Sequence, residues 1–387
     1  MNPVATEILM HQSPPIDDAL LRDLLAEIRS RRAEFEAQQF ISQDIVERFR
    51  TLGVYRALVA RRFGGDERSP AEFCRLVETI AQADGSAGWV SSFGIGAVYL
   101  SALPVDTLHQ LYERSPDVVF AGGIFPPRPA QVVDGGLKVN GRWSWASGCM
   151  GADVVGVGVA PKDGDTVGLP RMAVMPRAAA RVERNWDVVG LLGTGSHDLV
   201  VEDVIVPESW TFVRGGKSAL DEPLYRYPTL AFAAQVLSVV GLGIARAALD
   251  EVETMGGRQS VTGAPKLGDR VAAQLDIAKA EADLRSARSW FYEAIDTVWQ
   301  VLLSGGEPAP HQVSLLRLSS THATRVSAEV TRRAQMLTGM TGVYESSPLA
   351  RQVRDAQMIT QHAFMGDVTY QNAGAMLFGL SPQPGYL

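Results

Sequence analysis

Two short segments of the chain combine residue types that can contact a ligand together. Trp145 and Ser147 stand two positions apart in Trp143-Ser144-Trp145-Ala146-Ser147-Gly148. A strand points residues i and i+2 to the same face, so this aromatic ring and this hydroxyl can face one ligand. An ordinary buried tryptophan would give the same pattern. A second segment, Gly193-Thr194-Gly195-Ser196, places two hydroxyls in a glycine turn, a feature that is also common without any ligand.

His362 is the third candidate for chemistry, and it lies 25 residues from the C-terminus. Imidazole titrates near neutral pH, so His362 can orient or deprotonate a substrate; a histidine that only packs between helices is the alternative. The remaining candidates lack the spacing of a metal site, so we predict no bound metal. They are His11, His109, His311, His322, Cys74 and Cys149.

The elements that must position these residues follow the order helix, strand, helix. Helical periodicity runs from Asp17 to about Glu113, and Ser69-Pro70-Ala71-Glu72 is typical of a helix start. Strands follow to about Val213, with a hairpin predicted at Gln131–Val139 and strands at 154–160, 171–175, 181–188 and 199–206. Long helices are expected near 265–303, 311–337 and 349–377. The fold class is therefore α+β.

Composition excludes several classes of function. The chain has 387 residues, 46% of them hydrophobic, with 43 acidic and 36 basic residues and a net charge of −7. An acidic balance argues against binding to nucleic acids and to anionic membranes. The apolar stretch Leu230–Ala248 is interrupted by polar residues, so we predict a core helix rather than a membrane span. Gly241-Leu242-Gly243 within it is better explained by close helix packing than by phosphate binding.

Four segments in this order resemble the acyl-CoA dehydrogenase superfamily and together cover nearly the whole chain. The first joins Arg62-Phe63-Gly64-Gly65 to Asp84-Gly85-Ser86-Ala87-Gly88-Trp89, and the second is the segment around Trp145. The third leads from Gly190 through Ser196 to Glu208, and the fourth is Arg351-Gln352-Val353-Arg354-Asp355-Ala356. The resemblance implies an N-terminal helical domain (1–116), a middle β-barrel or sandwich domain (117–213) and a C-terminal four-helix bundle (214–387).

The same resemblance implies a flavin between the β-domain and the bundle. On the matching positions, Trp145, Ser147, Gly148, Thr194 and Ser196 would bind the flavin, and Arg258 would hold its phosphate, commonly across a subunit interface. Ser147 would also be catalytic, because a hydrogen bond near flavin N5 and exclusion of water are needed to keep a hydroperoxide intact. Arg258 lies after two glycines and is equally compatible with a solvated surface charge.

The C-terminal segment separates two branches of this superfamily. A dehydrogenase needs a carboxylate base, yet no carboxylate follows Asp355 until Asp367, and His362 stands in between. Glu251 and Glu253 remain alternative bases for an FAD-dependent acyl-CoA dehydrogenase or oxidase. The sequence more closely resembles the oxygenase components of two-component flavin monooxygenases. Their reduced FMN or FAD comes from a separate NAD(P)H-dependent reductase and reacts with O₂ through a C4a-hydroperoxyflavin.

The expected substrate is a small aromatic or heteroaromatic molecule of the phenol or indole type. The resemblance implies a pocket lined by Trp89, Phe93, Ala97, Tyr99 and His362, with His362 catalytic. Hydroxylases of this branch have a histidine where this chain has Ala97. This difference argues against phenol hydroxylation and leaves indole oxidation, N-oxygenation and S-oxygenation as possible reactions. A catalytically silent bundle used for assembly is disfavoured, because Trp145 and Ser147 are retained.

The remaining expectations concern assembly and location. The resemblance and the long C-terminal helices imply a homotetramer. Residues 1–15 lack a basic segment followed by an apolar one, so we predict no signal peptide and a cytoplasmic enzyme.

Overall fold

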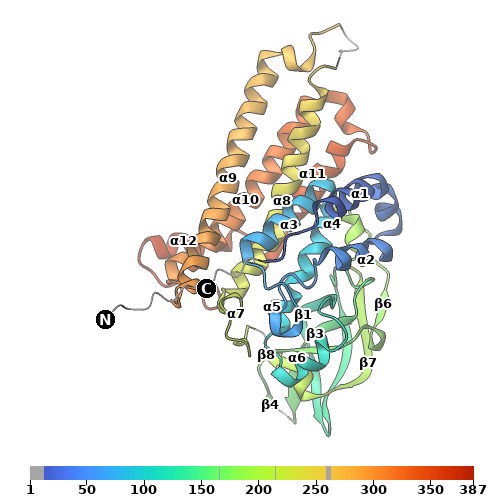
Figure 1. Cartoon of the computed structure of the whole chain (residues 1–387), viewed down its shortest axis with the longest axis vertical. Helices are drawn as coiled ribbons and strands as arrows, with labels where there is room; N and C mark the ends of the chain where they lie inside the picture. Colours follow the sequence, from blue (N-terminus) through green and yellow to red (C-terminus); the bar gives the residue numbers. More distant parts are fainter. Residues whose placement is uncertain (1–12, 165, 214, 259–262) are drawn as a thin grey trace.

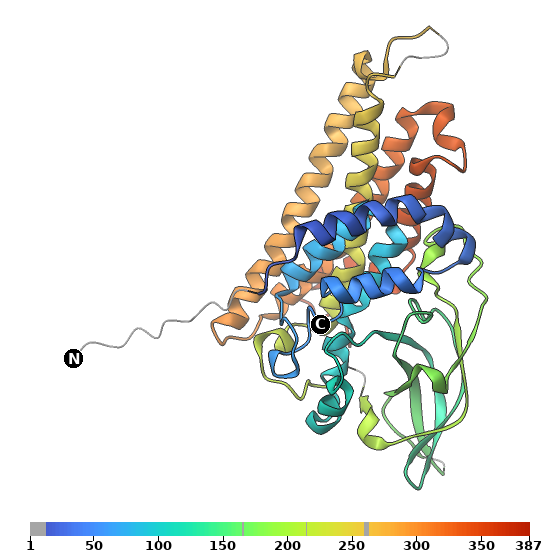
Figure 2. The same ribbon diagram turned by 45° about the vertical axis from the view of Figure 1, so that its right-hand side comes forward.

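The computed structural model describes residues 13–164, 166–213, 215–258 and 263–387. Helices form both ends of the chain, and a sheet lies between them in sequence (Figure 1). In both ribbon views the N-terminal helices, drawn in blue, lie between the sheet and the long C-terminal helices (Figure 2). The N-terminal helices are α1 (Asp18–Gln38), α2 (Gln43–Leu52), α3 (Pro70–Ala83), α4 (Gly85–Ser91), α5 (Gly96–Leu100) and α6 (Val105–Tyr112). Helix α6, drawn in teal, lies beside the strands of the sheet (Figure 1).

The strands form one mixed sheet in the order β6-β7-β2-β1-β3-β5-β8, with β4 paired to β3. Strands β1 and β3 run parallel, and the other described pairs are antiparallel. The strands are β1 (Phe120–Val133), β2 (Gly136–Trp143), β3 (Val154–Asp163), β4 (Thr166–Val167), β5 (Arg171–Pro176), β6 (Arg181–Glu183), β7 (Asp198–Val206) and β8 (Thr211–Val213).

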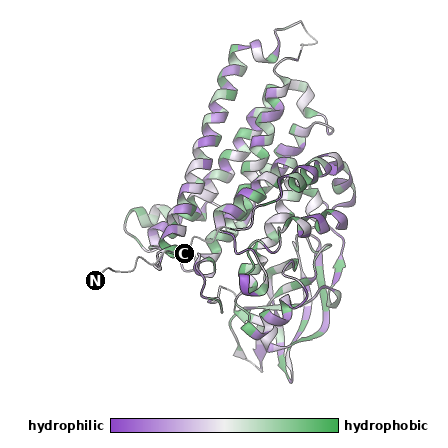
Figure 3. Cartoon of the chain, viewed as in Figure 1, coloured by the Kyte–Doolittle hydropathy of each residue, from purple (hydrophilic) through white to green (hydrophobic). Residues whose placement is uncertain are grey.

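The C-terminal helices form a bundle in which hydrophobic and hydrophilic residues are interspersed (Figure 3). Helix α8 is long and apolar enough to cross a membrane, but 83% of its most apolar 18-residue window is buried within the protein. It is therefore the core helix that its polar interruptions predict. The C-terminal helices are α7 (Pro223–Arg226), α8 (Thr229–Met255), α9 (Val271–Leu303), α10 (Pro310–Leu337), α11 (Pro348–Thr360) and α12 (Val368–Leu377).

Local signals account for several of these boundaries. Helix α3 begins with a capping box, in which the Glu72 amide donates to the Ser69 hydroxyl at 3.2 Å and the Ser69 amide donates to the Glu72 carboxylate at 2.8 Å. The hairpin between β1 and β2 turns at Asp134 and Gly135, where Gly135 has φ +88°. In α8, a Cβ on Gly243 would stand 2.4 Å from the carbonyl oxygen of Glu78 in α3. Close helix packing therefore explains this glycine.

Two predicted elements differ from the structure. The helix expected over 349–377 is broken after Thr360, and a short 3-10 turn, η8 (Ala363–Met365), precedes α12. His362 begins that turn, because its Nδ1 accepts the amide of Phe364 at 3.2 Å. The strand expected over 181–188 ends at Glu183, because the amides of Asn185 and Trp186 turn inward and donate to Nδ1 of His197 at 3.2 and 3.1 Å.

Candidate active site

The site begins where helix α4 meets the loop that follows β2. The indole N–H of Trp89 in α4 donates to the hydroxyl of Ser147 at 3.1 Å. Both residues are buried, although they are 58 positions apart in the chain. The loop is closed at the next residue, where the amide of Gly148 (φ +72°) donates to the carbonyl of Thr194 at 2.8 Å. The structure therefore brings the three predicted segments around Trp89, Ser147 and Thr194 together.

A row of hydroxyls continues inward from Ser147. Ser147 Oγ lies 2.7 Å from Ser196 Oγ, and Ser196 Oγ lies 2.7 Å from Thr194 Oγ1. Thr194 then donates to the carbonyl of Leu191 at 2.9 Å. All three hydroxyl residues are buried, so each hydroxyl depends on its neighbours for hydrogen bonds rather than on bulk water.

The glycine turn that carries this row is held by two helices. The amide of Leu191 donates to Asp355 of α11 at 2.6 Å, and the amide of Gly193 donates to the Ser86 hydroxyl of α4 at 3.1 Å. Leu191 has φ +53°, a conformation that costs energy for a branched residue and therefore needs such support. Burial, and then the charge of Asp84, raise the pKa of the Asp355 carboxyl to about 7. The Arg-Asp-Ala segment thus acts on the site through the turn.

His362 reaches the site from the break between α11 and α12. Its ring meets that of Trp89 edge-to-face at a centroid distance of 5.9 Å, and it lies 4.9 Å from the ring of Phe364. Burial lowers the pKa of His362 to about 4, so the imidazole is neutral at pH 7. Because Nδ1 accepts the Phe364 amide, the ring proton is on Nε2. His362 is therefore placed to donate a hydrogen bond rather than to remove a proton.

An apolar cavity of about 110 Å³ has Phe364 in its wall. It runs between the sheet and the helices, and aromatic rings form much of its wall. Of the predicted pocket residues, Phe93 and Tyr99 line it, whereas Trp89, Ala97 and His362 are not among its lining residues. Ala97 is buried in the adjoining core. The cavity is lined by Phe93, Val98, Tyr99, Ser101, Ala102, Phe120, Gly122, Ile124, Met172, Phe212, Val213, Gly215, Gly216, Ser218, Thr229, Leu230, Ala233 and Phe364.

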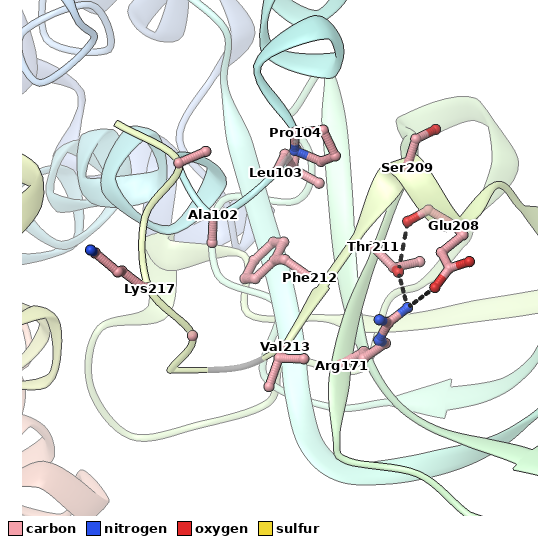
Figure 4. A pocket seen from close by; sticks show the side chains of 12 residues that line it. Ala102, Leu103, Pro104, Arg171, Glu208, Ser209, Thr211, Phe212, Val213 and Lys217 are labelled. Atoms are coloured by element: carbon pink, nitrogen blue, oxygen red, sulfur yellow. Dashed lines mark hydrogen bonds and ion pairs between the residues drawn. The ribbon is translucent and has the colours of Figure 1, made fainter. Parts of the chain in front are cut away.

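A wider groove of about 570 Å³ shares Ala102, Phe212 and other wall residues with this cavity (Figure 4). On one side of Phe212, Arg171 donates to Glu208 at 3.1 Å and to the Thr211 hydroxyl at 3.0 Å. Lys217 lies on the opposite side and forms no ion pair with any residue that the structure describes. The groove therefore offers one cation that is not neutralised beside an apolar wall.

Trp145 differs from the prediction in its surroundings. Strand β2 ends at Trp143, and Trp145 has φ +64°, so the residue pair 145 and 147 does not share a strand face as expected. Trp145 instead leaves the loop with 67% of its surface exposed, while Ser147 turns inward. The exposed Trp145 ring lies close in sequence to the buried hydroxyl row that begins at Ser147. A planar ligand with a polar edge could stack on the ring and hydrogen-bond to Ser147. These residues therefore fit a flavin.

Arg258 and the alternative base Glu253 lie apart from these residues. Arg258 follows the C-terminal end of α8, at the tip of the bundle that points away from the sheet (Figure 1), and it is exposed. Within one chain it therefore does not join the hydroxyl row. Glu253 lies on the exposed side of α8, where it accepts a hydrogen bond from Arg246 at 3.0 Å.

Sequence reasoning missed Asp355 as a positioning residue and missed much of the cavity wall. The Arg-Asp-Ala segment was a visible motif, but the sequence did not indicate that its carboxylate reaches the amide of Leu191, 164 residues away. Phe120, Phe212 and Phe364 have no chemical signature that separates them from other core aromatics. They meet only because the sheet and both helical regions border one cavity.

Comparisons with known proteins agree with this arrangement. The family described as acyl-CoA dehydrogenase, C-terminal domain, matches residues 235–367. Indole-3-acetate monooxygenase of Pseudomonas putida is 66% identical over 361 residues, which cover 93% of this chain and 92% of that protein. The flavin-dependent monooxygenase oxygenase subunit HsaA of Rhodococcus jostii is 32% identical, over 88% of this chain and 92% of that protein.

A solved structure extends the likeness to the whole fold. The crystal structure of 3-HSA hydroxylase from Rhodococcus sp. RHA1 superposes with a TM-score of 0.89 at 29% identity. The match covers 95% of this chain and 98% of that one. The arrangement of N-terminal helices, sheet and bundle is therefore shared as a unit.

Proposed function

This chain belongs to the flavin-dependent monooxygenases of the acyl-CoA dehydrogenase fold, and we propose that it oxygenates indole-3-acetate or a closely similar aryl acetate. It is the oxygenase component of a two-component enzyme that uses reduced flavin and O₂ and acts on aromatic substrates. A partner reductase supplies the reduced flavin. The observation that carries the choice of substrate is the 66% identity with an indole-3-acetate monooxygenase over 92% of its length.

The cavity supports an aromatic substrate of this kind. Its aromatic and aliphatic lining favours a planar apolar ring, since burying apolar surface is the main source of affinity in such pockets. His362 does not line the cavity, but its ring contacts that of Phe364 in the cavity wall at a centroid distance of 4.9 Å. We propose that its Nε2 donates to a polar atom of a substrate that extends past Phe364. In this role His362 orients the substrate and does not need to change its charge.

The carboxylate of an aryl acetate calls for a cation near the apolar wall. Lys217 in the groove beside Phe212 would attract it at the entrance, whereas Arg171 is already neutralised by Glu208. An exposed cation of this kind mainly raises the rate of capture, and its effect weakens with salt.

The residues around Ser147 would hold the flavin. Trp145 would lie against its ring system, and Ser147 would meet its polar edge, with Thr194 and Ser196 behind. When bound, reduced flavin supplies the electrons that activate O₂. The buried indole of Trp89 and the apolar cavity would keep water away from the reacting atoms.

We further propose that the chain works as a cytoplasmic homotetramer, and that its reductase uses NAD(P)H. Arg258 supports the tetramer, because a phosphate-binding arginine at the tip of the bundle could act only on a flavin held by a neighbouring copy. A direct comparison of FMN with FAD in a reductase-coupled assay decides which flavin the enzyme uses.

The proposed substrate is tested by kinetics with a flavin reductase present. We expect indole-3-acetate to be consumed with a higher kcat/KM than indole or phenol. We expect Lys217→Glu to lower kcat/KM for indole-3-acetate several-fold, with little effect on neutral indole, and the difference to shrink in high salt. Equal kcat/KM for indole and indole-3-acetate in the unmodified protein would contradict recognition of an aryl acetate.

A further inference from the structure

The hydroxyl row behind the flavin site has a fixed direction. It starts at the indole N–H of Trp89, passes through Ser147, Ser196 and Thr194, and ends at the carbonyl of Leu191, with successive distances of 3.1, 2.7, 2.7 and 2.9 Å. Both ends are fixed in kind, because an indole N–H can only donate and a carbonyl oxygen can only accept.

The directions of the middle bonds follow by elimination. Each hydroxyl has one proton, and Thr194 gives its proton to the Leu191 carbonyl. Ser196 must then donate to Thr194, and Ser147 must donate to Ser196. The Ser147 hydroxyl therefore donates its one proton to Ser196 and accepts one hydrogen bond from Trp89. A single lone pair remains for any further partner.

Burial prevents the row from reversing easily. Ser147, Ser196 and Thr194 are 5%, 4% and 2% exposed, so bulk water does not offer the hydroxyls alternative acceptors. The carbonyl at the end of the row is fixed as well, because the Leu191 amide is bound to Asp355 at 2.6 Å. The Leu191 carbonyl also accepts the Trp186 indole N–H and the Thr194 amide, each at 3.1 Å. Reversing the row would still be unfavourable, because Thr194 Oγ1 and the Leu191 carbonyl oxygen would face each other at 2.9 Å with no proton between them.

We propose that this row makes Ser147 a hydrogen-bond acceptor and thereby selects the reduced form of flavin over the oxidised form. The inference rests on the proposed placement of the flavin at Ser147. Reduced flavin carries an N–H at N5 and can donate to the remaining lone pair, whereas oxidised flavin presents a lone pair at N5 and meets another lone pair. Thr194 and Ser196 act through Ser147 and are positioning residues for redox selectivity.

The test is the ratio of dissociation constants for oxidised and reduced flavin, measured by fluorescence titration in air and under anaerobic reduction. In Thr194→Val the Leu191 carbonyl keeps its two N–H donors and Ser196 loses its acceptor, so Ser196 can donate to Ser147 and Ser147 can donate to flavin. We expect the ratio to fall about tenfold, the value of one hydrogen bond. Thr194→Ser keeps the hydroxyl and should keep the ratio. Ser196→Ala frees Ser147 in the same way and serves if Thr194→Val does not fold.

Two controls separate the possible failures. Thr331→Val removes a buried hydroxyl that bonds only to a helix carbonyl in α10, and it should leave the ratio unchanged. An unchanged ratio in Thr194→Val and Ser196→Ala would overturn the selectivity proposal. If Ser147→Ala leaves both dissociation constants unchanged, the flavin does not lie at Ser147 and the proposed placement fails instead. If Ser147→Ala weakens reduced flavin while the other variants keep the ratio, the placement stands and the selectivity proposal falls.

Discussion

At the scale of single residues, His362 is defined by the bonds of its two nitrogens. Nδ1 accepts the Phe364 amide at 3.2 Å, and burial lowers the pKa of the ring to about 4, so Nε2 carries a proton that it can donate. Glutamine can replace a donor at Nε2 but cannot act as a base. We therefore expect His362→Gln to keep most of the rate of product formation and His362→Ala to lose about tenfold to a hundredfold. Reductase-coupled product analysis measures both.

The lowered pKa of His362 also predicts how the rate depends on pH. His362 stays neutral above its lowered pKa. The pH profile of the rate should therefore show no inflection near pH 6.5 that is caused by His362, and the profile of His362→Gln should have the same shape. An inflection of that kind, together with equal losses in the glutamine and alanine variants, would show that His362 serves as a base.

Asp355 links a buried charge to stability. Burial and Asp84 raise the pKa of the Asp355 carboxyl to about 7, above its value in an unfolded chain. The folded state then holds a proton that the unfolded state releases. The contribution of Asp355 to stability is therefore fully present below about pH 4 and is lost as the pH rises to about 7, by up to roughly 4 kcal/mol. Asp355→Asn removes this charge and should reduce the fall. Urea unfolding at pH 5 and pH 8 measures it.

A matched variant checks the origin of that pH dependence. Asp276 lies exposed in α9, and Asp276→Asn should leave the fall in unfolding free energy as it is. If Asp355→Asn loses as much stability between pH 5 and pH 8 as the unmodified protein, the buried carboxyl is not the source.

At the scale of elements, the sequence predicts those whose signals are local. The capping box at Ser69 and the hairpin turn at Gly135 each depend on residues that are close in sequence, and both predictions are confirmed. The break before η8 was not predicted, because no proline marks it and the helix ends where Phe364 turns into the cavity. Trp89 and Ser147 could be named as site residues from their motifs. Their hydrogen bond could not, because it joins residues 58 positions apart.

Helix α8 tests the packing of the bundle on the N-terminal helices. A methyl group on Gly243 would meet the Glu78 carbonyl at 2.4 Å, so Gly243→Ala should lower the free energy of unfolding by about 1–3 kcal/mol through overpacking. Gly374 in α12 has no atom within 4 Å of the position that a Cβ would take, and Gly374→Ala should be neutral or slightly stabilising. Denaturant unfolding compares them, and equal effects would contradict the close contact.

At the scale of the whole molecule, the C-terminal region leaves large apolar side chains uncovered. Phe378 is 86% exposed, Leu377 is 82% exposed and Met340 is 75% exposed. Leu377 and Phe378 are adjacent in the chain, and neighbouring exposed apolar side chains are typical of surfaces that contact another chain. We expect light scattering to give a mass near four times that of the chain, and Phe378→Asp to shift the protein to smaller species. Val167→Asp, on exposed β4, should leave the measured mass unchanged. A monomer at micromolar concentration would contradict the assembly.

Above all, we propose that this chain transfers oxygen from O₂ to an aromatic acid with reduced flavin made elsewhere. The most direct measurement is mass spectrometry of the product formed from indole-3-acetate under ¹⁸O₂, with NADH and a flavin reductase. We predict a product that contains one ¹⁸O atom and forms only when the reductase and O₂ are both present. A product without ¹⁸O, or anaerobic reduction of bound oxidised flavin by an acyl-CoA with no aromatic product, would contradict it.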